Sequence, residues 1–149
     1  MKRFIDITDF TREELREAIN LVTFVNSNQH VYSKEMEGRI LINAFYNEDR
    51  NAKMAFTTAA TRMGGTHFDF NCNESESLKD AVTTMSSCGD VIVLNHPKKG
   101  AARAASLYAT IPVINAGKKL MENPRDYEAR ATIMWASSLS HNDLTGCGR

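Results

Sequence analysis

Cysteine is scarce in this chain of 149 residues, and its three positions are scattered: Cys72, Cys88 and Cys147. An odd number of cysteines, none in a CxxC pair and none behind a secretion signal, argues against a disulfide framework. The chain also has four histidines without the spacing of metal ligands: His30, His67, His96 and His141. We therefore expect no metal and no cofactor.

Long apolar runs and an excess of one charge are absent too. The longest apolar runs, such as VIVL at 91–94, are far too short to span a bilayer. The N-terminus has a basic start but no apolar signal-peptide core, so we expect a cytoplasmic protein. Eighteen basic residues balance eighteen acidic ones, which predicts neither a nucleic-acid partner nor an anionic membrane surface.

What the sequence does contain is an alternation of strand and helix patterns. A capping box, Thr11 with Glu14, opens the first helix. The expected helices are 12–27, about 52–63, about 78–85, 100–109 and 124–137, and the expected strands are 39–46, 66–71, 91–94 and 111–114. This alternation predicts an α/β domain over residues 1–137, with a polar tail over 138–149. Its architecture is three-layer αβα, with a four-stranded parallel sheet and helices on both faces.

In this class, ligands bind at the carboxyl ends of the strands, so the turns to consider are 46–51, 72–77, 95–100 and 116–124. The first turn, within FYNEDRNAKMAF at 45–56, presents Glu48 and Asp49 where a phosphate site would offer glycine, hydroxyl and basic groups. Carboxylates do suit a helix N-terminus, as a cap and as a partner of the helix dipole. We expect Asp49, or else Glu48, to occupy the position of an anion.

Several motifs agree in order and spacing with one known family. NHPKKGAARAAS at 95–106, IPVINAG at 111–117, AFTTAATRMGG at 55–65 and ESLKDAVTTMSSCGDVIVLNHP at 76–97 resemble the signatures of aspartate carbamoyltransferases. The resemblance covers roughly residues 4 to 135 and is to the carbamoyl-phosphate-binding domain. It implies that domain's fold, with the family's aspartate-binding domain missing.

The resemblance implies a vestigial carbamoyl-phosphate site, because the family's site residues are replaced. The family's S-T-R-T-R phosphate loop falls on Asp49, Arg50, Asn51, Ala52 and Lys53, so Asn51 stands in place of the phosphate-binding arginine. Three further replacements follow in the later turns. The arginine of the family's R-HP motif becomes Asn95, its carbonyl-polarising histidine Asn123 and its glutamine Asp126. By the same resemblance, the family's loop that enters a neighbouring subunit is shortened here to NCNES.

Other family positions are retained, and we expect them to serve turns and packing: His96, Pro97, Gly100, Arg103, Asn115 and Gly117. We expect Arg103 to pair with a buried carboxylate. Basic side chains should surround the same rim: Arg50, Lys98, Lys99, Lys118, Lys119 and Arg125. They read as a solvated surface, or alternatively as a patch for a new anionic ligand or an acidic partner.

Three functions follow from these observations. The first is a catalytically inactive relative, a pseudoenzyme that acts through protein association, either as a homotrimer or by joining the trimer of an active carbamoyltransferase. The second is a small-molecule or anion-binding or enzymatic domain, which uses Arg50, Asp126 and the lysines for different chemistry. The third is half of a split aspartate carbamoyltransferase, completed by a separate chain.

Overall fold

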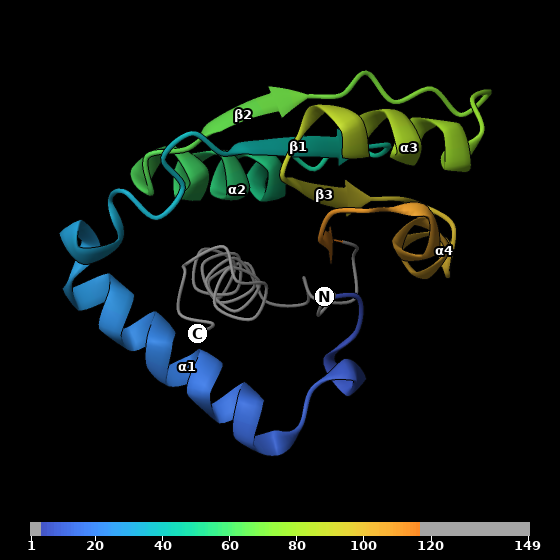
Figure 1. The fold of residues 1–149 in the computed structure, drawn as a ribbon. Coiled ribbons are helices and arrows are strands. Elements are labelled where there is room, and N and C mark those ends of the chain that lie inside the picture. Colours follow the sequence, from blue (N-terminus) through green and yellow to red (C-terminus); the bar gives the residue numbers. More distant parts are fainter. Residues whose placement is uncertain (1–3, 117–149) are drawn as a thin grey trace.

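A computed structural model describes residues 4–116 of the chain (Figure 1). Four strands form one sheet: β1 (Ile40–Phe45), β2 (Thr66–Asp69), β3 (Val91–Asn95) and β4 (Val113–Asn115). Four α-helices accompany them: α1 (Arg12–Ser27), α2 (Arg50–Arg62), α3 (Leu78–Cys88) and α4 (Ala101–Tyr108). Two short 3-10 helices, η1 (Ile7–Asp9) and η2 (Gln29–Tyr32), flank α1.

The sheet is parallel throughout, and its strand order is β2-β1-β3-β4. The register at its centre runs from Leu41 opposite Val91 to Phe45 opposite Asn95. From β1 the chain moves to one side, to β2, and then crosses to the other side, to β3. The strand order therefore reverses between β1 and β3, and the carboxyl ends of these two strands mark the expected ligand position.

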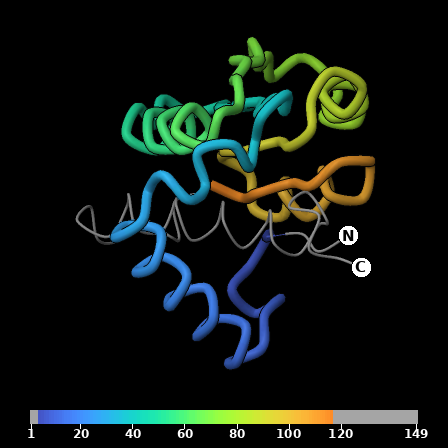
Figure 2. Tube along the Cα trace, turned by 60° about the vertical axis from the view of Figure 1, so that its left-hand side comes forward, coloured from blue at the N-terminus to red at the C-terminus, as the bar shows by residue number. Residues whose placement is uncertain are grey.

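Helices cover both faces of the sheet, which confirms the predicted three-layer architecture. One apolar cluster joins Phe56 and Ala60 of α2 to Leu41, Val93 and Ile114 of the strands. The cluster on the opposite face packs residues of α3 and α4 against the other side chains of β1, β3 and β4. Figure 2 shows α2 and α3 on opposite sides of the sheet. Burial on both faces explains the continuous apolar run of β3.

The N-terminal segment follows the predicted capping pattern. Thr11 Oγ1 accepts a hydrogen bond from the Glu14 amide at 3.2 Å, and the Glu14 carboxylate accepts one from the Thr11 amide at 2.8 Å. Helix α1 therefore begins where the capping box places it. A second reciprocal pair, Asp6 with Asp9, caps η1 and was not predicted. Helix α1 lies apart from the sheet in both views (Figures 1 and 2).

Strand boundaries differ from the prediction by two residues at two places, and by one residue elsewhere. Strand β4 begins at Val113 rather than residue 111, because Pro112 has no amide hydrogen to donate and contributes its carbonyl to Ile92 instead. Strand β2 ends at Asp69 rather than residue 71. The predicted helix 124–137 and the polar tail 138–149 lie outside the described residues.

Candidate functional site

The carboxyl ends of the strands bring together three of the four predicted turns. Tyr46 follows β1, and its amide donates to the carbonyl of Asn95 at the end of β3, at 2.9 Å. The segment from Phe70 to Ser77 follows β2, with Phe70 still bonded to the Asn43 carbonyl of β1. Parallel strands place these loops at one edge of the sheet, as predicted.

Asp49 caps helix α2. Its Oδ1 atom accepts a hydrogen bond from the Ala52 amide at 3.1 Å, and its backbone carbonyl accepts one from the Lys53 amide, also at 3.1 Å. The carboxylate thus takes the amide of the first helical turn that an anion would otherwise use. The adjoining Glu48 is exposed, as are Arg50 and Asn51, whereas Ala52 is fully buried in the core.

Lys53, which the resemblance places at the end of the family's phosphate loop, forms an ion pair. Its Nζ atom lies 2.7 Å from Oδ2 of Asp69 at the end of β2. Oδ1 of the same carboxylate accepts from Asn43 Nδ2 at 3.0 Å, and Asn43 also donates to Thr57 Oγ1 at 3.0 Å. Burial alone would raise the pKa of Asp69, but the hydrogen bonds from Lys53 and Asn43 lower it below its usual range.

Two buried asparagines mark the sheet side of this region. Asn43 and Asn95 are each 1% exposed, and the Oδ1 atom of each has no hydrogen-bond partner among residues 4–116. An unpaired buried amide oxygen costs free energy, so such atoms are uncommon in a folded protein. Both side chains lie on the α2 face, because they alternate with Ile42, Ala44 and Leu94 on the other face.

An aromatic and thiol cluster lies on the other side of the same edge. The rings of Tyr46 and His96 are 4.4 Å apart. Burial, Cys72 and Glu76 raise the pKa of Tyr46. Burial and the nearby Glu76 raise the pKa of the Cys72 thiol to about 11. Cys72 is therefore protonated at neutral pH, which is the opposite of what a nucleophilic cysteine requires.

His96 is held as a neutral acceptor. The Lys98 amide donates to His96 Nδ1 at 3.1 Å, which requires that nitrogen to carry no proton. Burial and the charge of Lys98 lower the pKa of His96, although Glu74 acts in the opposite direction. His96 thus takes part in a local turn, and Pro97 beside it is exposed.

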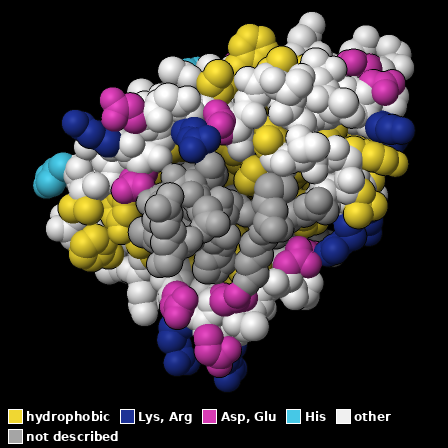
Figure 3. Space-filling view, in the orientation of Figure 1, with side chains coloured by type: hydrophobic (Ala, Val, Ile, Leu, Met, Phe, Trp, Pro, Cys, Tyr) yellow, Lys and Arg dark blue, Asp and Glu magenta, His cyan; other side chains and the backbone are white. Residues whose placement is uncertain are grey.

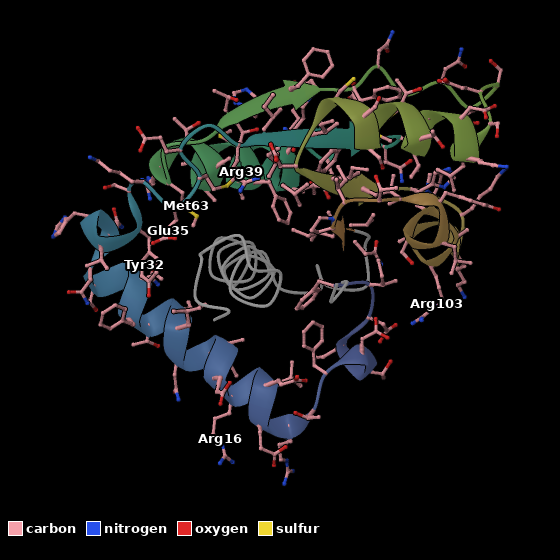
Figure 4. All side chains as sticks on the ribbon, in the orientation of Figure 1. Arg16, Tyr32, Glu35, Arg39, Met63 and Arg103 are labelled. Carbon is pink, nitrogen blue, oxygen red and sulfur yellow. The ribbon has the colours of Figure 1, made fainter. Side chains whose placement is uncertain are left out.

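The remaining scaffold positions hold turns and the N-terminal segment. Gly100 has φ of +80°, a conformation that favours glycine, directly before α4. Asn115 donates to the carbonyl of Ile5 at 3.0 Å. Arg103 reaches from α4 toward the N-terminal segment (Figure 4), where it lies 3.1 Å from Asp9. The predicted buried partner of Arg103 is wrong, because Asp9 belongs to an exposed 3-10 helix.

Several predicted site residues fall outside the description: Gly117, Asn123 and Asp126 of the family pattern, and Lys118, Lys119 and Arg125 of the basic rim. Of the described rim residues, Arg50, Lys98 and Lys99 are all exposed. The space-filling view shows charges of both signs over the surface, with hydrophobic side chains in separate groups (Figure 3).

Sequence reasoning missed the side chains that organise this edge: Asn43, Thr57, Asp69, Tyr46 and Cys72. One signal was available, since an asparagine inside the apolar strand ILINAF must find partners when buried. Among residues 4–116, no three His, Cys, Asp or Glu side chains are grouped as metal ligands. No helix in that part of the chain has the length and apolar character needed to cross a membrane.

Comparisons with known proteins agree with this architecture. The family model "Aspartate/ornithine carbamoyltransferase, carbamoyl-P binding domain" matches residues 2–127. The chain is 37% identical to the aspartate carbamoyltransferase catalytic subunit of Clostridium novyi (strain NT), over 83% of this chain and 42% of that protein. It is 35% identical to the same subunit of Clostridium perfringens (strain 13 / Type A), over 99% of this chain and 50% of that protein.

Solved structures give the same result. The catalytic subunit of M. jannaschii aspartate transcarbamoylase superposes with a TM-score of 0.73 at 35% identity, over 78% of this chain and 41% of that chain. Aspartate transcarbamoylase of Trypanosoma cruzi, in complex with carbamoyl phosphate, superposes with a TM-score of 0.71 at 27% identity. The match covers 78% of this chain and 40% of that chain. The chain spans about half the length of the curated relatives it matches. It belongs to the aspartate/ornithine carbamoyltransferase family, through the carbamoyl-phosphate-binding domain.

Proposed function

We propose that this chain is a catalytically inactive member of its family, a pseudoenzyme that acts by associating with other protein chains. The observation that carries the proposal is Asn95, whose amide is buried and whose Oδ1 atom has no partner. By resemblance, this position belongs to an arginine that contacts carbamoyl phosphate. A neutral amide replaces a charged guanidinium there, so the position offers neither a positive charge nor a bidentate pair of donors to a dianion.

The surrounding charges support the same conclusion. Asp49 already accepts the hydrogen bond from the Ala52 amide. Lys53 is neutralised by Asp69. Glu74 and Glu76 lie near enough to shift the pKa values of His96 and Cys72. A carboxylate beside a bound phosphate costs on the order of a few kcal/mol in a partly buried site.

Carbamoyl transfer depends on donors placed around the phosphate and the developing oxyanion. Removing one such donor typically costs about 2.7–4 kcal/mol of transition-state stabilisation. With asparagine at positions 51 and 95, two charged guanidinium groups are missing, and Asp49 adds a negative charge that repels a phosphate. The scaffold meanwhile keeps its fold, and fold and activity separate readily when site residues change. We infer that association is the retained role, as a homotrimer or within the trimer of an active carbamoyltransferase.

Ligand titration tests the loss of the phosphate site. We expect no saturable thermal shift with carbamoyl phosphate or a bisubstrate phosphonate. The matched variant combines Asp49→Ser, Asn51→Arg and Asn95→Arg, which restores the family's residue types at three positions. Stabilisation of that variant alone supports the proposal, whereas saturable stabilisation of the natural chain at micromolar ligand contradicts it.

Association is tested separately. Light scattering measures the oligomeric state of the chain alone. Co-expression with an active aspartate carbamoyltransferase tests whether the two co-purify, and whether activity per catalytic chain changes. A chain that neither self-associates nor co-purifies contradicts the proposed role, even if the phosphate site is inactive.

One observation favours a second candidate, a domain with altered ligand chemistry. The unpaired Oδ1 atoms of Asn43 and Asn95 are acceptors that a small molecule with N–H donors could satisfy. The exposed Arg50 would contribute a charge at the same edge. A half of a split carbamoyltransferase is the third candidate. Formation of carbamoyl aspartate, assayed with and without a separately supplied second chain, distinguishes it from the other two.

A further inference from the structure

The outer edge of β2 is open along its whole length in the described structure. The strand is the first in the order β2-β1-β3-β4, and all four of its residues are exposed. Phe68 is 59% exposed, which is high for a large apolar side chain within a strand. Of the features that keep edge strands from pairing, THFD lacks a lysine and a proline, although the strand is short and carries the charged Asp69.

The backbone directions on this edge follow from the bonds to β1. The amides of Thr66 and Phe70 donate to Arg39 and Asn43 of β1, both at 2.9 Å. Since these directions alternate along a strand, the amides and carbonyls of His67 and Asp69 point away from the sheet. An added strand would therefore hydrogen-bond to His67 and Asp69.

Side-chain directions alternate in the same way. Asp69 points to the α2 face, where it contacts Lys53. His67 lies on that same face, and Phe68 lies on the opposite one. Along the strand, the His67 imidazole and the Asp69 carboxylate therefore lie on the α2 face, and the Phe68 ring between them lies on the opposite face.

We propose that β2 pairs antiparallel with β2 of a second copy, about a two-fold axis through Phe68. In this register His67 faces Asp69 of the second copy, Asp69 faces His67, and the two Phe68 rings lie opposite each other. The imidazole presents an N–H donor to the carboxylate whether or not it carries a second proton. The outward backbone groups form the hydrogen-bonded pairs, and the Phe68 pair falls at a non-hydrogen-bonded position, where side chains lie closest.

Charge selects this register and this occupant. Shifting the strands by two residues either way places His67 opposite His67 or Asp69 opposite Asp69. Either shift loses both His67–Asp69 pairs, and the second brings two carboxylates together, which is unfavourable. A two-fold axis through Phe68 brings the His67 donor of each copy to the Asp69 carboxylate of the other, so the strand is complementary to itself, as an isologous contact requires. The Asp69 side chain is 49% exposed despite its pair with Lys53, so its oxygens have capacity for a further donor.

Sedimentation velocity over a range of protein concentrations tests the contact with the full chain. We expect His67→Glu to halve the mass of the natural assembly and to weaken association about tenfold or more, because two attractive pairs become repulsive. His67→Gln keeps an N–H donor and should stay within about threefold of the natural chain. His30→Glu, the same change at an exposed site on η2, should have no effect. Circular dichroism verifies that all variants are folded.

Cross-linking tests the register. Phe68→Cys, in a background with the three natural cysteines changed to serine, places two Cα atoms about 4.5 Å apart, within the range of a disulfide. We expect this variant to oxidise to a covalent dimer much faster than Leu107→Cys in the same background, since Leu107 is 73% exposed on α4. The proposal is overturned if these two variants oxidise at equal rates or if His67→Glu leaves the mass of the assembly unchanged. It is also overturned if the natural chain stays monomeric at all concentrations.

Discussion

The replacement Asp49→Ala separates the capping role of this carboxylate from any role in binding. Asp49 is the residue before the first turn of α2, and its Oδ1 atom accepts the Ala52 amide at 3.1 Å. Alanine removes this acceptor and the charge, whereas Asp49→Ser removes the charge but keeps a hydroxyl that can cap. The two variants together show which property stabilises the chain.

The expected magnitude follows from the geometry of the cap. Removing an N-cap acceptor costs about 0.5–2 kcal/mol, and typically about 1 kcal/mol. We expect the upper half of this range, because the deprived amide belongs to Ala52, which is fully buried and has poor access to water as a substitute partner. A loss of 1 kcal/mol corresponds to a decrease in Tm of about 2–4 °C for a chain of this size.

Urea unfolding followed by circular dichroism measures both variants against the natural chain. Asp49→Ala should lower the midpoint without changing the m-value, and Asp49→Ser should recover most of the loss. If Asp49→Ala is neutral or stabilising, the carboxylate does not act as the cap of α2. If serine is as destabilising as alanine, the charge matters rather than the hydrogen bond, and a helix-dipole account replaces the capping account.

Two further changes test other features of the structure. In urea unfolding, Gly64→Ala should lower the free energy of unfolding by at least about 2 kcal/mol more than Gly38→Ala does. Both glycines have a positive φ, but only a Cβ added at Gly64 would meet the Ser33 carbonyl oxygen, at 2.6 Å. Lys53→Met should cost less than about 1 kcal/mol at pH 7, because its ion pair with Asp69 is largely exposed. Since the folded-state pKa of Asp69 is lowered, that stabilisation is present at neutral pH and is lost as the pH falls below about 4. Unfolding of Lys53→Met and the natural chain should therefore converge at low pH, and a constant difference would refute this assignment.

Most of the fold could be predicted because local signals agreed with tertiary structure. The capping box of Thr11 and Glu14 sets the start of α1, and helical periodicity with Gly64 sets the end of α2. The 3-10 helices were not predicted, because segments of three or four residues carry no periodic pattern. The end of β2 was not predicted either, because alternation continues through Phe70 after pairing as a strand has ended.

The candidate site was predictable as a position but not as a set of contacts. Parallel topology requires the turns after β1 and β3 to meet, and family spacing identifies Asp49 and Asn95 within them. Neither argument reveals that Asn43 and Lys53 meet on Asp69, because those contacts depend on side-chain direction across three elements. Long-range polar pairs of this kind follow from packing, which the order of residues does not display.

Asp69 links the loop that opens α2 to the edge of the sheet. On the inner side its carboxylate is bonded to Lys53 and Asn43, so Lys53 already has an anionic partner within the chain. On the outer side the same carboxylate is 49% exposed at the open edge of β2, where our proposed contact uses it. Because that ion pair is largely exposed, moving Lys53 away from Asp69 costs less than about 1 kcal/mol, and the carboxylate keeps its hydrogen bond from Asn43. The pair therefore does not prevent the variant Asp49→Ser, Asn51→Arg, Asn95→Arg from binding carbamoyl phosphate.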